Sequence, residues 1–343
     1  MKTQLSLLGM ISLASITTGN PSEPKKPNII LIYVDDLGYG DLGCYGAQGI
    51  QTPHIDRLAK NGLLMTDAHC SAATCTPSRY SLLTGSYAFR SNVRVLDGGE
   101  PALIQPGMGT LPSMLQAAGY KTAIVGKWHL GLGDGNTDWN RAIKPGPLEV
   151  GFDYSFIIPT TGDRVPCVWV ENHHIVNFDP EDPVRVNYRT RVGDDPAGIS
   201  DPELLRYGAD TQHNNTIVNG ISRIGYMTGG KAARWKDEKF PHVMLLKARN
   251  FIKENKDNPF FLYFSFHDIH VPRLPDYPFI GKSGMGLRGD AILQTDWTTG
   301  ELIKSIEEYG LTENTLVIFT SDNGPVLDDG YDDLAVELLG EHQ

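Results

Sequence analysis

The chain has 343 residues, of which 40% are hydrophobic, and a formal net charge of −11. This length and composition suit one large α/β domain or two modest ones with a buried core. The acidic balance argues against nucleic acid as a partner, because phosphate backbones are bound by basic surfaces. A small anionic substrate stays compatible, since a local cluster of cations outweighs the global charge.

An apolar run near the N-terminus predicts export. Lys2 precedes the run Leu5 to Ile16, and small polar residues follow it. This pattern predicts a signal peptide over residues 1–20, a linker over residues 21–27, and a periplasmic or secreted protein. The run is too short to cross a bilayer, so no membrane span is expected. The alternative of a plain N-terminal helix stays open.

The first elements of the mature chain alternate between strand and helix. Residues 28–34 (NIILIYV) form a continuous β-branched run, which is typical of a strand buried on both faces of a parallel sheet. Pro53 predicts the first turn of a helix that ends near Gly62. A second helix is predicted over Thr110 to Ala118, and a short strand over Lys121 to Val125.

The same alternation returns near the C-terminus. We predict a helix within Val243 to Glu254, a strand over Pro259 to Phe266, a helix over Ile292 to Tyr309 and a strand over Thr315 to Thr320. Such alternation predicts an α/β fold with a mostly parallel central sheet flanked by helices on both faces.

The interval of about 131–240 has a different composition. It is rich in Gly, Pro, Asp and Asn and has few periodic apolar stretches. Long irregular segments in compact enzymes are usually functional loops. We therefore predict one domain over residues 28–343, with a polar loop insertion at 131–240 that builds the walls of a pocket.

Polar and titratable residues follow each predicted strand. Because parallel strands end at one edge of a sheet, and ligands bind at that edge in open α/β folds, these residues are expected to lie together. After the four strands come Asp35 and Asp36, then Lys127 and His129, then His267 and His270, and finally Asp322 and Asn323.

The oxygen-bearing members of this set predict a metal site. Asp35, Asp36, Asp322 and Asn323 are hard donors, which suit Ca²⁺ or Mg²⁺ rather than zinc or copper. Each motif alone also fits a structural role, since Asp caps helices and Asp-Asn-Gly forms turns.

The cationic members predict binding of an anionic ester. Arg79 and Lys127 can hold its oxygens, and His129 and His270 can transfer protons. A surface or core role is the alternative for each of them. His267 is a weaker candidate, and the predicted insertion holds two further histidines that we expect on the substrate side or in solvent. These two are His173 and His174.

The run Cys75-Thr76-Pro77-Ser78-Arg79, followed by Leu83-Thr84-Gly85, is the most specific motif of the chain. It resembles the signature of the formylglycine-dependent sulfatases, a family of the alkaline-phosphatase-like superfamily. The runs PNIILIYVDDLGYGD, GKWHLG and SDNG support the resemblance, which extends from about residue 28 to residue 325.

The resemblance implies a cofactor and a modified residue. In the family the cysteine is oxidised to formylglycine, here at Cys75, by a formylglycine-generating or anaerobic sulfatase-maturing enzyme. One Ca²⁺, with Mg²⁺ less favoured, is implied at a site shared with the modified Cys75. Its other ligands are implied to be Asp35, Asp36, Asp322 and Asn323.

The resemblance also implies catalytic roles. Arg79 supports the hydrated aldehyde, Lys127 and His270 contact the sulfate, and His270 protonates the departing alcohol. His129 serves the elimination that releases sulfate from a covalent sulfoenzyme intermediate. The implied reaction is hydrolysis of a sulfate ester.

A sulfated saccharide is the expected substrate of an exported enzyme with a long polar insertion. Candidate sugar contacts are Thr161, Asp163 and Arg164, together with Trp139 and Trp169, and each equally fits a structural role. The type of sugar and the position of its sulfate stay open.

Two departures from the family pattern concern the C-terminus. The family usually has a second catalytic lysine shortly after the Asp-Asn-Gly motif and then a smaller C-terminal subdomain, and neither is present before Gln343. We therefore expect a C-terminally truncated catalytic domain. The other cysteines are odd in number, so no disulfide is predicted. They are Cys44, Cys70 and Cys167.

Alternative functions stay open at this point. A phosphonate or phosphate monoester hydrolase of the same superfamily would use the same nucleophile. An inactive truncated relative would only bind sulfated glycan. A two-zinc phosphatase is disfavoured, because it would want an Asp-His pair where this chain has Asp322 and Asn323.

Overall fold

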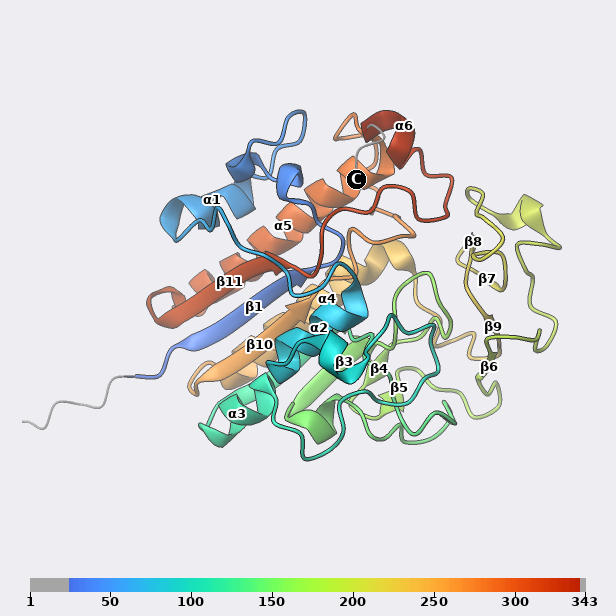
Figure 1. The fold of residues 1–343 in the computed structure, drawn as a ribbon, viewed down its shortest axis with the longest axis horizontal. Coiled ribbons are helices and arrows are strands. Elements are labelled where there is room, and N and C mark those ends of the chain that lie inside the picture. Colours follow the sequence, from blue (N-terminus) through green and yellow to red (C-terminus); the bar gives the residue numbers. More distant parts are fainter. Residues whose placement is uncertain (1–24, 340–343) are drawn as a thin grey trace, which may run out of the picture.

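A computed structural model of the protein describes residues 25–339, so the predicted signal peptide lies outside the described residues. The centre of the fold is a seven-stranded sheet with the order β11-β1-β10-β2-β3-β4-β5 (Figure 1). The strands from β11 to β3 are parallel, and β4 and β5 are added antiparallel at one edge. The bounds are β1 (Asn28–Val34), β2 (Lys121–Lys127), β3 (Tyr154–Ile158), β4 (Val170–Glu171), β5 (His174–Ile175), β10 (Phe260–Ser265) and β11 (Thr315–Ser321).

Helices cover both faces of this sheet, which confirms the predicted fold class. Figure 1 shows α2 and α3 in front of the sheet and α4 and α5 behind it, with α1 packed against α5. The helices are α1 (Pro53–Asn61), α2 (Cys75–Thr84), α3 (Leu111–Ala117), α4 (Phe240–Asn255), α5 (Gly286–Glu308) and α6 (Ala335–Leu339). Short 3-10 turns cover Tyr39–Asp41, Gly43–Tyr45, Ala88–Ser91, Pro147–Val150, Pro202–Leu204, Asp237–Lys239 and Thr312–Asn314.

Apart from the start of α5, the predicted elements match the observed ones to within a turn at their ends. The first strand covers the predicted residues, and Thr110 caps α3 by accepting a hydrogen bond from the Ser113 backbone. The largest difference is in α5, which begins at Gly286 rather than at Ile292. Helix ends depend on caps and packing, which a hydrophobic pattern records poorly.

The predicted loop insertion at 131–240 needs correction. It contains β3, β4 and β5, which belong to the central sheet. The run YSFII of β3 is apolar or aromatic except for Ser155, but the Gly-, Pro- and Asp-rich segments around it hid the strand from the sequence analysis. The rest of the interval forms two small antiparallel sheets. Their strands are β6 (Arg185–Asn187) with β9 (Tyr226–Thr228), and β7 (Ile217–Val218) with β8 (Ile221–Ser222).

The parallel register brings the carboxyl ends of the strands to one edge. Val34 of β1 pairs with Ser321 of β11, and Ser265 of β10 pairs with Gly126 of β2. The residues that follow these strands are therefore neighbours in space. Between residues 25 and 339, no helix combines the length and the apolar character needed to cross a membrane.

The sheet predicts unequal costs for two substitutions of the same kind. Ile32 of β1 is 0% exposed, whereas Ile318 of the edge strand β11 is 40% exposed. We expect Ile32→Ala to lower the free energy of unfolding by about 2–5 kcal/mol, because it leaves a cavity between packed layers. Ile318→Ala is the matched control and should cost less than about 1 kcal/mol. Urea unfolding of both variants measures the difference, and equal costs would contradict this packing.

Candidate active site

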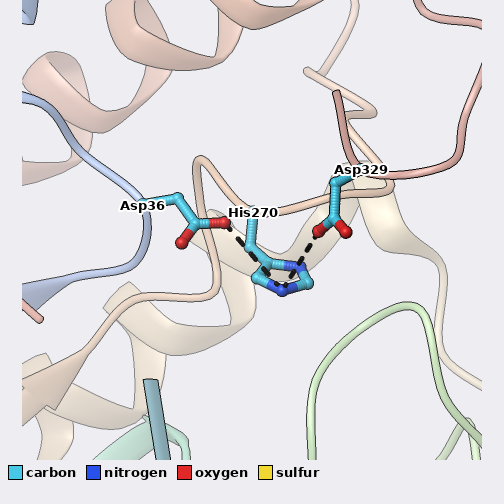
Figure 2. A group of neighbouring side chains, drawn as sticks. All are labelled: Asp36, His270 and Asp329. Carbon is cyan, nitrogen blue, oxygen red and sulfur yellow. Dashed lines mark ion pairs between the residues drawn. The ribbon is translucent and has the colours of Figure 1, made fainter. Parts of the chain in front are cut away.

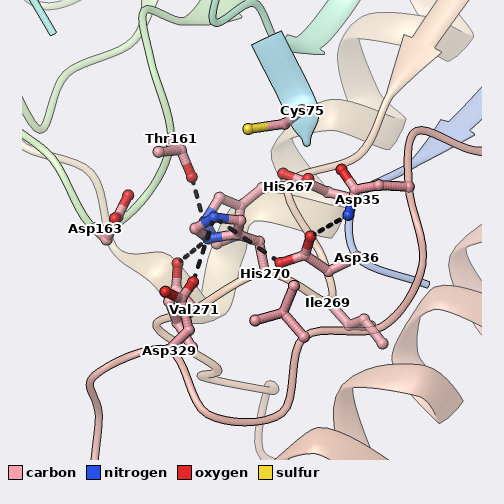
Figure 3. A network of polar contacts seen from close by, with 12 residues as sticks. Asp35, Asp36, Cys75, Thr161, Asp163, His267, Ile269, His270, Val271 and Asp329 are labelled. Atoms are coloured by element: carbon pink, nitrogen blue, oxygen red, sulfur yellow. Dashed lines mark hydrogen bonds and ion pairs between the residues drawn. The ribbon is translucent and has the colours of Figure 1, made fainter. Parts of the chain in front are cut away.

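The structure brings the predicted polar residues together at the carboxyl edge of the sheet. Asp35 and Asp36 follow β1, and Asp322 and Asn323 follow β11. The amino end of α2 places Cys75 above this edge (Figure 3). All five side chains are buried, so the groups are held in one protected site rather than scattered over a surface.

Three carboxylates form a cluster with unsatisfied oxygens. Ligand atoms of Asp35, Asp36 and Asp322 lie within 4.8 Å of one another. Oδ1 of Asp35, Oδ2 of Asp36 and Oδ1 of Asn323 are buried without a hydrogen-bond partner. Buried polar atoms are normally paired, so these orphaned oxygens point to a missing partner. Hard oxygen donors with this arrangement fit a Ca²⁺ ion.

Charge repulsion within the cluster supports the same conclusion. Burial and the Asp35 carboxylate raise the pKa of Asp322 to about 7. Burial, with Asp35 and Asp322, also raises the pKa of Asp36 well above its usual range. Carboxylates this close resist simultaneous ionisation, and a divalent cation among them would remove the repulsion.

Two fully buried cations partly balance the charge of the cluster. Arg79 donates from Nε and Nη2 to Oδ2 of Asp322, at 3.1 and 2.7 Å, and from Nη1 to Oγ of Ser265 at 2.5 Å. Lys127 forms an ion pair with Asp35. Burial alone would lower the pKa of Lys127, but the Asp35 carboxylate raises it, so the ammonium stays charged. The predicted cationic residues thus lie beside Cys75.

Cys75 faces a histidine. Its Sγ lies 3.2 Å from Nδ1 of His129, whose Nε2 is 2.9 Å from the carbonyl oxygen of Leu96. The Leu96 carbonyl accepts a hydrogen bond from the Nε2–H group, so the ring proton is on Nε2. Nδ1 is therefore free to accept a proton from the residue at position 75. Burial raises the pKa of the Cys75 thiol to about 12, and burial with the Lys127 charge lowers that of His129 well below its usual range. An unmodified thiol here is protonated at neutral pH and is a poor nucleophile.

His270 lies on the opposite wall of the site. Its Nδ1 donates to the carbonyl oxygen of Val271 at 2.7 Å. Its Nε2 is 3.9 Å from Oδ2 of Asp36 and 3.7 Å from Oδ2 of Asp329 (Figure 2). Oγ1 of Thr161 is 3.3 Å from the ring Nδ1 (Figure 3). Burial and the Lys127 charge lower the pKa of His270 to about 3, so the free protein holds a neutral ring.

Asp163 and Arg164 form a second polar group next to His270. Nη1 of Arg164 donates to Oδ2 of Asp163 at 2.5 Å, and Nε2 of His213 lies 3.5 Å from the same oxygen. The other ring nitrogen of His213 is 2.8 Å from Oδ1 of Asp210. Oδ1 of Asp163 and Nε of Arg164 are buried without a hydrogen-bond partner, so this group holds one unsatisfied acceptor and one unsatisfied donor.

Sequence reasoning missed three residues of this region, namely Asp210, His213 and Asp329. Asp210 and His213 lie in irregular backbone with no motif around them, so only the folded chain reveals them. Asp329 follows the Asp-Asn-Gly motif by a few residues, and its place in the acidic pair after Pro325-Val326-Leu327 was the available signal.

Other predicted candidates have structural roles. For Trp139 and Trp169, burial favours the structural alternative over stacking on sugar, because they are 6% and 7% exposed and Trp169 stacks on Phe156 in the core. His173 pairs with Glu149 at 2.9 Å. The remaining cases are His174, which is exposed in β5, and His267, which is buried beside Phe240. All four cysteines are free, as expected.

Comparison with known proteins matches residues 27–338 to the family described as Sulfatase. The chain belongs to the sulfatase family. It is 52% identical over 352 residues to an N-acetylgalactosamine-6-O-sulfatase of Bacteroides thetaiotaomicron, an alignment that covers 100% of this chain and 69% of the relative. It is 36% identical over 309 residues to human arylsulfatase A, with 88% of this chain and 52% of the relative covered.

A solved sulfatase structure agrees with this assignment. This structure is of a protein designated 6S-sulf, from a genetic locus of Bacteroides thetaiotaomicron for the metabolism of multiple glycosaminoglycans. The two folds superpose with a TM-score of 0.90 at 54% identity, over 93% of this chain and 67% of the other. This sulfatase chain therefore spans about two thirds of its bacterial relatives and about half of the human one.

The buried thiol predicts slow alkylation. Because a thiol of pKa about 12 is ionised only to roughly one part in 10⁴ at pH 8, iodoacetamide should modify unmodified Cys75 far more slowly than the exposed Cys70. Peptide mass spectrometry over time measures both rates. Urea should bring the two rates together, and equal rates in the folded protein would contradict the buried, protonated thiol.

The carboxylate cluster predicts calcium-dependent stability. Calcium at about 100 times its Kd should stabilise the fold by roughly 2.7 kcal/mol, and Asp36→Asn should abolish this effect. Since the free Asp322 carboxyl has a pKa of about 7, calcium displaces a proton, and its affinity should weaken as the pH falls below 7. Calorimetry and thermal melts measure both effects. Exposed Asp257→Asn is the control, and an unchanged calcium response in Asp36→Asn would contradict the site.

Proposed function

We propose that this chain hydrolyses the sulfate ester of a 6-O-sulfated N-acetylgalactosamine saccharide. One observation supports the reaction above all: the Cys75 motif sits at the amino end of α2, beside an uncompensated carboxylate cluster and two buried cations. The 52% identity to an N-acetylgalactosamine-6-O-sulfatase supports the type of substrate. The signal peptide predicted for this chain suggests a periplasmic or secreted enzyme.

The metal site would hold one Ca²⁺. The proposed ligands from the strand ends are Asp35, Asp36, Asp322 and Asn323, and the residue at position 75 completes the set. When bound, the ion supplies positive charge that polarises the nucleophile and the ester oxygens. The orphaned oxygens of Asp35, Asp36 and Asn323 support this assignment.

A formylglycine derived from Cys75 by a maturing enzyme supplies, when hydrated, a hydroxyl nucleophile that the protonated thiol lacks. Arg79 donates a hydrogen bond to Asp322, and its positive charge would stabilise the hydrated residue at position 75. Lys127 lies within the same charge cluster and is placed to bind the oxygens of a sulfate group.

Proton transfer falls to the groups around position 75. Nδ1 of His129 faces the residue at 75 as an acceptor, and its neutral ring suits a general base. His270 presents Nε2 toward Asp36 and Asp329. Binding of an anionic ester favours the protonated form of this ring, which then donates to the departing alcohol. Thr161, Asp163 and Arg164 would contact the sugar.

Substitutions of Lys127 and His270, with Lys121 as the control, test the roles proposed for these two residues. Lys127→Ala and His270→Ala should each lower kcat/KM for sulfate release from N-acetylgalactosamine 6-sulfate by about 10²-fold or more, since they remove contacts to the developing charge. Lys121→Ala, at the exposed start of the same strand, should leave release unchanged. Ion chromatography of free sulfate measures the rates, and unchanged release in the first two variants would refute their roles.

Mass spectrometry of the protein and turnover of other esters distinguish the proposed sulfatase from the alternative functions. Mass spectrometry of the Cys75 peptide should show formylglycine in an active preparation, and an intact thiol there would contradict the mechanism. Faster turnover of a phosphate or phosphonate monoester would favour the related hydrolase. Formylglycine without turnover of any ester would favour a protein that only binds sulfated glycan.

A further inference from the structure

Two buried cations lie beside the metal cluster, and two further carboxylates lie on the other side of the His270 ring. Arg79 and Lys127 are fully buried cations on the side of the metal cluster. In Figure 3, Asp163 and Asp329 lie on one side of the His270 ring and the metal cluster lies on the other. An ester that sets its sulfate against the cations therefore extends its alcohol portion toward carboxylates.

The backbone holds Asp329 in this position. The segment after β11 is joined to the segment before β7 by an antiparallel bridge between Ala209 and Tyr331. The backbone N–H of Asp210 donates to the carbonyl oxygen of Gly330 at 2.8 Å. Gly330 also packs so closely on His213 that an added Cβ would lie 2.5 Å from Nδ1 of that ring. Asp329 thus lies in a segment that is tied to the loop carrying Asp210 and His213.

A buried arginine fixes the same segment to the loop that carries His270. The Arg273 guanidinium donates from Nε to the carbonyl oxygen of Ile269 at 3.0 Å and from Nη2 to that of Val326 at 2.6 Å. Its Nη1 pairs with Oδ2 of Asp333 at 2.6 Å. These bonds hold Asp329 and His270 at a constant separation, as expected of groups that act on the same ligand.

The available hydrogen-bonding atoms suit a hydroxyl group. Oδ1 of Asp163 and Nε of Arg164 have no partner, and the side chain of Asp329 is 35% exposed. A hydroxyl both donates and accepts, so it can satisfy carboxylate and guanidinium together. A sulfate group only accepts, and it would bring a negative charge against two carboxylates.

The positive groups near Asp163 and Asp329 do not cancel the negative charge of these carboxylates. Arg164 is already paired with Asp163 at 2.5 Å. Burial lowers the pKa of His213, but Asp163 and Asp210 raise it above its usual value, so its charge is matched by theirs. Among the residues that the structure describes, no arginine or lysine forms an ion pair with Asp329, whose ion pair is to Nε2 of His270 at 3.7 Å.

We propose that Asp329, together with Asp163, selects sugars in which the hydroxyl next to the scissile sulfate ester is not itself sulfated. The proposal rests on the proposed function and adds a selectivity to it. Juxtaposed like charges in a partly buried site oppose binding strongly. Disulfated sugars should therefore be poorer substrates until a separate sulfate ester hydrolysis removes the neighbouring sulfate.

The test compares N-acetylgalactosamine 6-sulfate with its 4,6-disulfate. We expect kcat/KM for 6-sulfate release to be at least about tenfold higher for the monosulfate. Asp329→Asn should narrow this ratio by accelerating the disulfate, whereas exposed Asp332→Asn on the same segment should not. Added salt should also narrow the ratio in the wild type, a change that steric exclusion would not produce.

Binding supplies a second readout that does not need turnover. In protein with unmodified Cys75, calorimetry should show the same preference in Kd, reduced by Asp329→Asn. Equal kcat/KM and equal Kd for the two sugars would overturn the proposal, as would a ratio that Asp329→Asn leaves unchanged. A preference in Kd without any sulfate release would support the selectivity and contradict the proposed reaction. Absence of both binding and release would contradict both.

Discussion

The arrangement of this protein depends on the compensation of charge inside a dry site. Asp35, Asp36 and Asp322 are buried within a few ångströms of one another, and Arg79 and Lys127 are buried against them. Removing one partner of a buried pair typically costs about 3–5 kcal/mol, because the other charge stays behind. The carboxylates outnumber the cations, so the cluster without a metal has an excess of negative charge that a divalent ion can neutralise.

The parallel sheet makes this concentration of charge possible. The strands β1, β2 and β10 are buried along almost their whole length, β11 lies at the edge of the sheet, and all four bring their carboxyl ends to the site. Apolar side chains of β1 and β10 hold the strand ends in register, so the polar groups need no support of their own. Ser265 shows the coupling directly, since it ends β10 and accepts a hydrogen bond from Arg79.

The predictable part of the site and the missed part differ in how they are built. Asp35, Lys127 and Asp322 follow apolar strands, so the rule that strand ends converge predicts that they meet. His213 and Asp210 lie in irregular backbone, and their position depends on contacts with a distant segment, among them the bridge between Ala209 and Tyr331. No periodic pattern records such a contact. The strand β3 was missed for a related reason, because its flanks have the composition of loops.

The two parts also have different relations to function. The end proposed to hold the metal and the sulfate carries the motifs by which the chain resembles the sulfatases, and the chemistry proposed there would be the same for any sulfate ester. The wall with Asp163 and Asp329 is assembled from loops between and after the strands. Loops accept changes that a packed sheet does not. A family that keeps one reaction while changing its sugar would be expected to vary this wall, and the charge of Asp329 is the kind of feature through which it can do so.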